Sequence, residues 1–293
     1  MTSPGPNPAL TELPRPLVAV MSSGFFGFFA HAGFLQGLTD LGLRPDAFAG
    51  CSSGALVAAF AAAGVAPQDM LAMFQRLTRE RFWDPPRGLS LIRWLVSGLR
   101  GRSGYLAGQA FENLLNEFLP AARFEDCQRP CLMVALEIGS GRRVVLDRGP
   151  LAPAVRASGA VPGLFAAVPW GQDLLVDGGL VDKAPLMACV ERMKPASLVV
   201  HLLPSASLET PLAATLGRTL APLRVHGRAV DAARQQVFQD QLEAVRKRGV
   251  RVVETLAQGL PRCGPRSLQR GPAAFAAARR NTLAQLAEVC PTN

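Results

Sequence analysis

The sequence has 293 residues, of which 49% are apolar and 18% are charged. This length suits one large domain with one hydrophobic core, and the composition excludes an intrinsically disordered chain. The net charge of +9 comes from basic residues that are almost all arginine. Because a biased genome composition produces such usage, the charge alone does not predict a nucleic-acid partner, and we expect none.

Six cysteines without CxxC spacing and three scattered histidines predict reduced, mostly buried thiols and no zinc site. No calcium pattern is visible either, so we expect no metal or other cofactor. Residues 1–14 are polar and proline-rich and lack a basic region before an apolar one. We therefore expect a flexible tail over 1–14, no signal peptide and a cytoplasmic protein.

Two windows, 17–38 and 47–68, contain no Asp, Glu, Lys or Arg and are about as long as a transmembrane helix. Clusters of glycine and serine interrupt both windows. We interpret each as a buried strand, a tight turn and a buried helix in succession, and we predict no membrane span.

In chain order, residues 16–21 and 46–50 predict two strands, each followed by a glycine-containing turn and a helix. Apolar spacing predicts further helices and strands, with helices at 67–79, 89–99, 109–119, 230–247 and 273–289 and strands at 131–138, 143–147, 174–176, 197–203 and 250–255. This rhythm indicates an α/β fold, a three-layer α/β/α arrangement around a mostly parallel central sheet. We expect one domain over 15–293, with the motifs in 16–190 and a C-terminal helical extension at 205–293.

The pentapeptide GCSSG at 50–54 fits the G-x-S-x-G pattern of a nucleophile elbow. In such an elbow the serine lies on a sharp strand-to-helix turn. Small flanking residues, here Gly50 and Gly54, let the backbone take a strained conformation that exposes the hydroxyl. Ser52 is therefore the candidate nucleophile, and Ser53 is a rival that lies outside the central position.

A serine nucleophile needs a base, and none of the three histidines has the setting of one. His31 lies within the first predicted helix and His201 within an apolar strand, as packed core histidines do. No turn signature surrounds His226. A Ser-His triad stays an open alternative, but no pattern favours it.

Asp177 ends an apolar run and is followed by Gly178 and Gly179. Open α/β sheets collect functional groups at the carboxyl ends of their strands, which makes this carboxylate a candidate partner for the serine. Taken alone, a β-turn that favours Asp and Gly is the simpler explanation.

Four ordered blocks give these residues a common context, namely SSGFFG at 22–27, GCSSG at 50–54, AVRASGAVPGLF at 154–165 and DGG at 177–179. Together they resemble the patatin-like phospholipases, which combine a glycine-rich loop after the first strand, a G-x-S-x-G elbow, an A-x-x-A-S-x-A-x-P-x-x-F stretch and a D-G-G or D-G-A motif. The resemblance spans roughly residues 16–190 and leaves the C-terminal hundred residues unmatched.

The resemblance implies a serine lipid acyl hydrolase that works through an acyl-enzyme with a Ser52–Asp177 dyad and no histidine. It also implies an oxyanion hole from the amides of Gly24 and Phe25, with Gly27 supporting the loop. The substrate would be a glycerophospholipid or another acyl lipid, with no nicotinamide or flavin.

This chain departs from the family in the first loop, which usually reads G-G-G-x-R-G. Serine replaces two glycines, and Phe26 stands in the place of the arginine. Any non-proline residue supplies a backbone N–H, so an oxyanion hole can survive. The missing arginine leaves the headgroup preference open. The phenylalanines at 25, 26, 28 and 29 indicate either an apolar site mouth or simply core.

Two other functions stay open. A carboxylesterase for small esters would use the same dyad. A phosphate- or nucleotide-binding protein would use the loop at 24–27, but it would need the full G-x-G-x-x-G pattern and an acidic residue about twenty residues further on, which this chain lacks.

Residues 76–102 hold seven arginines against two acids, interleaved with Phe82, Trp83 and Trp94. Such a segment can contact an anionic membrane, since arginine attracts anionic headgroups and aromatic rings favour the interface. The alternative is an ordinary helical segment on the surface with its arginines paired. We carry peripheral membrane contact through 76–102 forward as a hypothesis.

Overall fold

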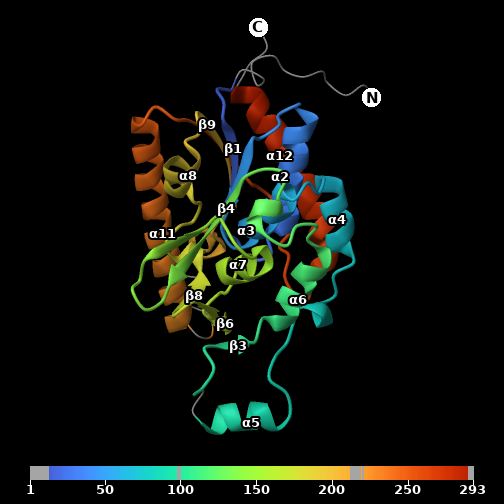
Figure 1. Ribbon diagram of the computed structural model, residues 1–293, viewed down its shortest axis with the longest axis vertical. Helices are drawn as coiled ribbons and strands as arrows, with labels where there is room; N and C mark the ends of the chain where they lie inside the picture. The colour runs from blue at the N-terminus through green and yellow to red at the C-terminus, as the bar shows by residue number, and fades with distance from the viewer. Residues whose placement is uncertain (1–12, 98–99, 212–218, 220, 290–293) are drawn as a thin grey trace.

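The computed structural model describes residues 13–97, 100–211, 219 and 221–289, so most of the predicted tail at 1–14 lies outside the described residues. An eight-stranded sheet forms the centre (Figure 1), in the order β10-β9-β1-β2-β4-β8-β7 with β5 also paired to β4. Its strands are β1 (Leu17–Met21), β2 (Ala47–Gly50), β4 (Cys131–Glu137), β5 (Arg143–Leu146), β7 (Val168–Trp170), β8 (Asp173–Asp177), β9 (Ser197–Leu202) and β10 (Arg251–Leu256). A separate pair joins β3 (Gly104–Leu106) to β6 (Gly163–Phe165).

Five neighbouring strands, β10, β9, β1, β2 and β4, are parallel. Strands β5 and β8 run antiparallel to β4, and β7 runs antiparallel to β8. The predicted α/β fold is confirmed, and the sheet is mixed, with its parallel part at the centre. Strands β1 and β9 are buried along their whole length because helices cover both faces of the sheet.

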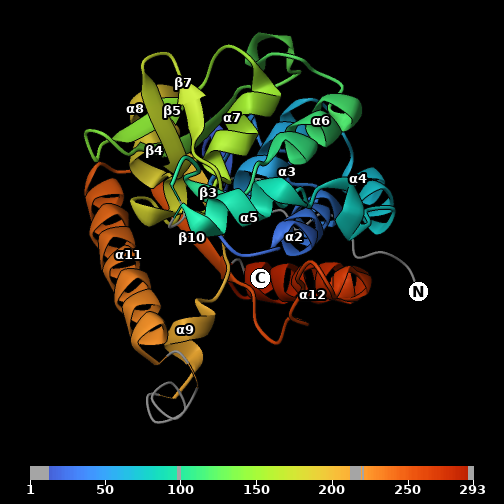
Figure 2. The ribbon, with the colours of Figure 1, turned by 90° about the horizontal axis from the view of Figure 1, so that it is seen from below.

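Helices form a layer on each side of the sheet (Figures 1 and 2). One layer consists of α2 (Phe28–Asp40), α3 (Ser53–Ala62), α4 (Pro67–Gln75), α7 (Leu151–Ser158) and α12 (Gly271–Val289), and the other of α8 (Leu186–Met193) and α11 (Ala221–Lys247). Alternate residues of β1 divide between them: Ala19 and Met21 face the first layer, and Val18 and Val20 face the second. Outside the layers lie α5 (Leu89–Val96), α6 (Gln109–Phe118) and α9 (Ala206–Glu209).

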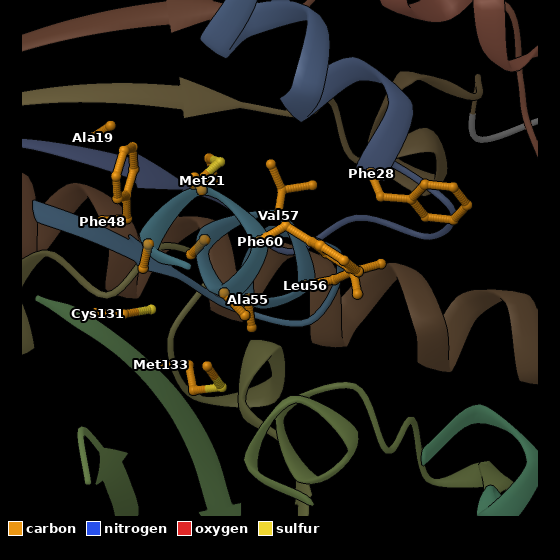
Figure 3. Close-up of a cluster of buried hydrophobic side chains, with 14 of the residues drawn as sticks. Ala19, Met21, Phe28, Phe48, Ala55, Leu56, Val57, Phe60, Cys131 and Met133 are labelled. Carbon is orange, nitrogen blue, oxygen red and sulfur yellow. The ribbon is translucent and has the colours of Figure 1, made fainter. Parts of the chain in front are cut away.

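The larger core lies between α3 and the sheet. Figure 3 shows this cluster running from Ala19 and Phe48 at one end to Leu56 and Phe28 at the other. Helix α3 is apolar on every side, so it is buried all round rather than on one stripe. This helix carries the chain directly away from the GCSSG turn and holds that turn against the core.

Several elements differ from the sequence prediction. Helix α11 begins at Ala221 rather than at 230, because its first turns are largely exposed and therefore carry no apolar stripe to predict. Short elements such as β3, β6, β7 and α7 were not predicted at all. Both charge-free windows form a strand, a turn and a helix as expected, and none of the helices in the described ranges has the length and apolarity to cross a membrane.

Candidate active site

Ser52 occupies a sharp turn between β2 and α3, with φ 55° and ψ −118°. A residue other than glycine rarely adopts a positive φ, and such strain is common at functional sites. The flanking glycines make the turn possible. A Cβ on Gly50 would lie 2.2 Å from the carbonyl oxygen of Gly54, and one on Gly54 would lie 2.2 Å from that of Met21. The predicted role of Gly50 and Gly54 therefore has a steric cause.

Ser158, at the end of α7, holds the Ser52 turn in place through two hydrogen bonds. Its buried hydroxyl accepts a hydrogen bond from the amide of Ser52 at 3.1 Å and donates one to the carbonyl of Val134 at 2.7 Å. The serine of the 154–165 block thus ties the elbow to strand β4. The sequence singled out this block only through its resemblance, and the contact supplies a physical reason for the serine.

Asp177 lies at the end of β8, within reach of Ser52. One of its carboxylate oxygens accepts a hydrogen bond from the Gly179 amide at 2.7 Å. The side chain of Ser52 is near enough to act on this carboxylate, since it lowers the pKa of Asp177. A Cβ on Gly178 would lie 2.2 Å from the carbonyl oxygen of Val134, and one on Gly179 would lie 2.7 Å from the Cβ of Ser23. The two glycines therefore allow Asp177 to sit close beside the first loop.

Burial raises the pKa of Asp177 above its ordinary value, even though the hydrogen bonds from Ser52 and Gly179 and the charge of Arg234 oppose this effect. A carboxylate with a raised pKa is a better proton acceptor. Asp177 was expected at the carboxyl end of an apolar strand, and it lies at the end of β8, which runs antiparallel to β4. Strand β4 continues to Glu137, beyond the row of Met21, Gly50 and Met133, and Asp177 lies opposite Ala135, two residues after Met133.

The loop between β1 and α2 borders the same site. The amides of Ser22 and Ser23 are engaged, since they donate to the carbonyls of His201 at 3.1 Å and Lys183 at 2.7 Å. Within the described part of the chain, the amides of Gly24 and Phe25 donate to no acceptor, and both residues line the cavity described below. Gly27 closes the loop through a bond from its amide to the carbonyl of Gly24 at 3.2 Å.

The histidines lie away from Ser52. His31 and His201 are buried and face each other with their Nδ1 atoms 2.8 Å apart, and Nε2 of His31 donates to the carbonyl of Ser22 at 2.8 Å. Burial lowers the pKa of His31 to about 3 and that of His201 well below its usual range. Both rings are therefore neutral supports for the first loop. His226 lines a second cavity beside α9 and α11, which shares Val161, Pro162 and Leu180 with the cavity of Ser52.

Ser52 and Asp177 open onto a cavity of about 290 Å³. Its wall is mainly aromatic, with nine phenylalanines at positions 25, 26, 28, 60, 74, 82, 111, 118 and 165. The loop phenylalanines thus serve both predicted roles: Phe25 and Phe26 line the cavity, Phe28 belongs to both cavity and core, and Phe29 is buried in the core. Arg234 of α11 also lines the cavity. Sequence reasoning missed this residue, because no motif marks the C-terminal third.

The chain is similar to proteins of several bacteria and fungi. Two uncharacterized NTE family proteins of Mycobacterium tuberculosis are 36% and 31% identical, over 58% and 59% of this chain and 27% and 45% of their own lengths. The protein named Lysophospholipase NTE1 of Cryptococcus neoformans is 28% identical over 57% of this chain and 10% of its own length. This chain therefore matches less than half the length of each of these relatives.

Among solved structures, VipD from Legionella pneumophila has a similar fold. It matches 94% of this chain and 67% of its own, with a TM-score of 0.52 and 13% sequence identity. The family model described as patatin-like phospholipase matches residues 19–190, a stretch that contains the first loop, the GCSSG turn, Ser158 and Asp177. By this match, and with the fold and site just described, the chain belongs to the patatin-like phospholipase family.

Proposed function

We propose that this chain is a serine lipid acyl hydrolase of the phospholipase A or lysophospholipase type that uses Ser52 and Asp177 as a catalytic dyad. The observation that carries the proposal is the strained Ser52, which lines the same phenylalanine-rich cavity as the buried carboxylate of Asp177. No histidine lines this cavity among the described residues.

In the proposed reaction, Asp177 takes the hydroxyl proton of Ser52 while the serine oxygen attacks the ester carbonyl. The tetrahedral intermediate collapses to an acyl-enzyme, and the departing alkoxide takes the proton from Asp177. Water then attacks the acyl-enzyme with Asp177 again as the base, and the fatty acid leaves as Ser52 regains its proton. The raised pKa of Asp177 suits a group that alternates between base and acid.

The developing oxyanion would be held by the amides of Gly24 and Phe25, whose N–H groups have no other acceptor in the described ranges. Donors fixed by the backbone stabilise negative charge without reorganising, and loss of one such donor costs roughly 10²–10³-fold in rate. The engaged amides of Ser22 and Ser23 hold the loop in place instead.

The aromatic wall supports a long acyl chain as the part of the substrate that enters the cavity, because each buried methylene gains about 0.8 kcal/mol. The name of the fungal relative points the same way. A carboxylesterase for small esters would leave most of this wall unused. A phosphate-binding role is not favoured either, because two amides of the loop already bond to backbone carbonyls.

The segment at 76–102 divides into two parts. Its first part packs onto the body: Phe82 is buried, Arg81 pairs with Glu117, and Arg79 lies over the ring of Trp83 at 4.9 Å. This part therefore behaves as an ordinary surface element, with Arg79 and Arg81 engaged. Helix α5 differs, since it stands away from the body at one end of the molecule (Figure 1).

Helix α5 exposes four large apolar side chains, Leu89 (78%), Ile92 (57%), Leu95 (57%) and Val96 (83%). Arg87 and Arg93 beside them are exposed and pair with no carboxylate in the described part of the chain. We propose that α5 contacts an anionic lipid surface, inserting these apolar side chains while the arginines meet the headgroups. The side chain of Trp94, included in the original hypothesis, lies outside the described residues.

Labelling with a fluorophosphonate tests the dyad. The probe should react with Ser52 of the folded protein, and Ser52→Ala should lose both labelling and ester hydrolysis while keeping its circular dichroism spectrum. Ser53→Ala is the matched control, since Ser53 is the neighbouring hydroxyl of the same turn. Labelling that persists in Ser52→Ala, or that maps to Ser53 or Ser158, would overturn the proposal.

A further inference from the structure

Arg234 reaches the active site from the opposite end of the sequence. It belongs to α11, well beyond the family match at 19–190. One of its terminal nitrogens donates to the hydroxyl of Ser23 in the first loop, and the other pairs with Asp231 at 2.8 Å. Its side chain is 19% exposed. A largely buried guanidinium is thus fixed in place at the edge of the catalytic loop.

This guanidinium keeps unused donors. Arginine carries five N–H groups, of which the two contacts above use two. Its Nε is buried and has no partner in the described ranges. A buried donor without an acceptor is unfavourable, so the site gains if an anion completes the set. Asp231 cannot do so alone, because its other oxygen accepts from Ser207.

The charge of Arg234 is also placed to act on the site. It lowers the pKa of Asp177 and the pKa of Lys183, so its field extends over the dyad. Among the described residues that line the cavity, Arg234 is the only cationic one. The rest of the polar lining consists of Ser23, Ser52, Ser53, Asp177 and backbone.

These features define two ends of a substrate. The phenylalanine wall accommodates the acyl chain, and the ester carbonyl must lie at Ser52. With the acyl chain on the phenylalanine wall, Ser23 and Arg234 are the polar side chains of the cavity, besides Ser52, Ser53 and Asp177, that can face the alcohol part of the ester. A neutral alcohol would leave the Arg234 donors unsatisfied, whereas a phosphate matches the forked geometry of a guanidinium.

We propose that Arg234 is a specificity-determining residue that binds an anionic group, a phosphate in particular, on the alcohol side of the ester. The inference rests on the proposed acyl hydrolase function and assigns recognition of the anionic group to a residue of α11, outside the family match. It also restores a cation near the first loop, where Phe26 stands in the place of an arginine.

Kinetics with two matched substrates test this assignment. Octanoyl glycerol phosphate and octanoyl glycerol share the acyl chain and the ester and differ in the anion. Arg234→Gln should lower the ratio of their kcat/KM values, anionic over neutral, by about 10- to 100-fold, the range of a charge-assisted hydrogen bond. Arg234→Lys should fall between the two, because it keeps the charge and loses the fork. Arg246→Gln is the control, since Arg246 lies on the same helix and pairs with Glu254 of the edge strand β10, away from the cavity lining.

If Arg234 only supported the first loop through Ser23, both esters would lose rate equally and the ratio would not move, which would overturn the inference. Calorimetry on the Ser52→Ala protein provides a readout that needs no hydrolysis. Octyl phosphate should bind, and Arg234→Gln should weaken this binding at least about tenfold, whereas equal binding by both proteins would also refute the assignment. A wild-type protein that binds octyl phosphate through Arg234 but cleaves neither ester would contradict the hydrolase function instead.

Discussion

The GCSSG elbow and helix α5 differ in burial, in packing and in how closely the chain is constrained. In the elbow, two glycines are so close to neighbouring carbonyls that a single added carbon would overlap them, and the carboxylate partner is buried. In α5, four large apolar side chains face solvent, and the helix stands apart from both layers of the fold. In the proposed function, ester hydrolysis depends on the tightly packed elbow. Lipid binding depends on the apolar surface of α5, which nothing in the described part of the chain covers. Changes in the two regions should therefore produce separable effects.

The largest effect is expected from Asp177→Asn, which removes the proposed base with little change in size. Hydrolysis of a soluble ester should fall by roughly 10²–10⁴-fold. Asp182→Asn is the matched control, because Asp182 is equally buried, has a pKa raised to about 6 and lies outside the cavity lining. A similar loss in both variants would mean that any buried carboxylate here is structural.

We also expect Asp177→Asn to change the stability of the protein. Because burial raises the pKa of Asp177, the folded protein binds this proton more tightly than the unfolded chain does, so ionisation of Asp177 lowers the free energy of unfolding. The Asn variant should therefore be more stable than the wild type above the folded-state pKa, and the difference should vanish as pH falls below about 4, the unfolded pKa. Urea titrations at several pH values measure this; an Asn variant less stable at pH 8 would contradict the sign.

Ser158→Ala tests the fastening of the elbow, and its effect should be smaller. The change removes the acceptor of the part-buried Ser52 amide and a donor to the Val134 carbonyl, which should lower the free energy of unfolding by about 1–3 kcal/mol. Hydrolysis should also slow as the elbow loses its fixed position. Ser197→Ala provides the comparison, because the Ser197 hydroxyl is buried but bonds to no described residue. Equal destabilisation by the two changes would exclude the proposed role of the Ser158 bonds.

Polar changes on α5 should spare chemistry and weaken binding to lipid. Replacing Leu89 and Ile92 together by serine should reduce co-sedimentation with anionic vesicles about tenfold or more, since each buried side chain of this size gains about 1.5–3 kcal/mol. Binding should decline with added salt, and hydrolysis of a soluble ester should stay at the wild-type rate. Ile138→Ser is the control, because Ile138 is an exposed apolar residue in the turn after β4 and not on α5. Wild-type binding by the α5 variant would remove this helix as the docking surface.

The smallest effect is expected from His226→Gln. A general base contributes roughly 10²–10⁴-fold, so a rate within about twofold of the wild type would show that His226 is not the base. Its place in the second cavity predicts this result. A loss comparable to that of Asp177→Asn would restore a triad.

Much of this arrangement can be read from local sequence. The central strands and the helices α2, α3 and α12 can be predicted from apolar runs and spacing, because an element that is buried carries apolar residues at the buried positions. Ser52 and Asp177 could be named because each follows an apolar strand and is flanked by glycines that tight turns require. The close contacts of the flanking glycines show why a residue with a Cβ does not fit at those positions.

Other features depend on contacts that no local pattern encodes. The antiparallel direction of β8 arises from pairing with β4, and its residues would look the same in either direction. The hydroxyl of Ser158 acquires its role from Ser52, more than a hundred residues away. Arg234 lies in a polar, exposed helix whose sequence resembles any solvated surface, and only its contact with Ser23 reveals it.

The position of α11 has a consequence for how this protein can be divided. Its Phe238, Leu242 and Val245 pack against the second face of the sheet, on Val18 and Val20 among others. A fragment limited to the family match at 19–190 would lose β9, β10 and this helix, and would leave one side of β1 open to solvent. The family motifs and the packed fold therefore have different boundaries, and recombination at residue 190 would transfer Ser52 and Asp177 without the strands and the helix that complete the sheet and its second layer.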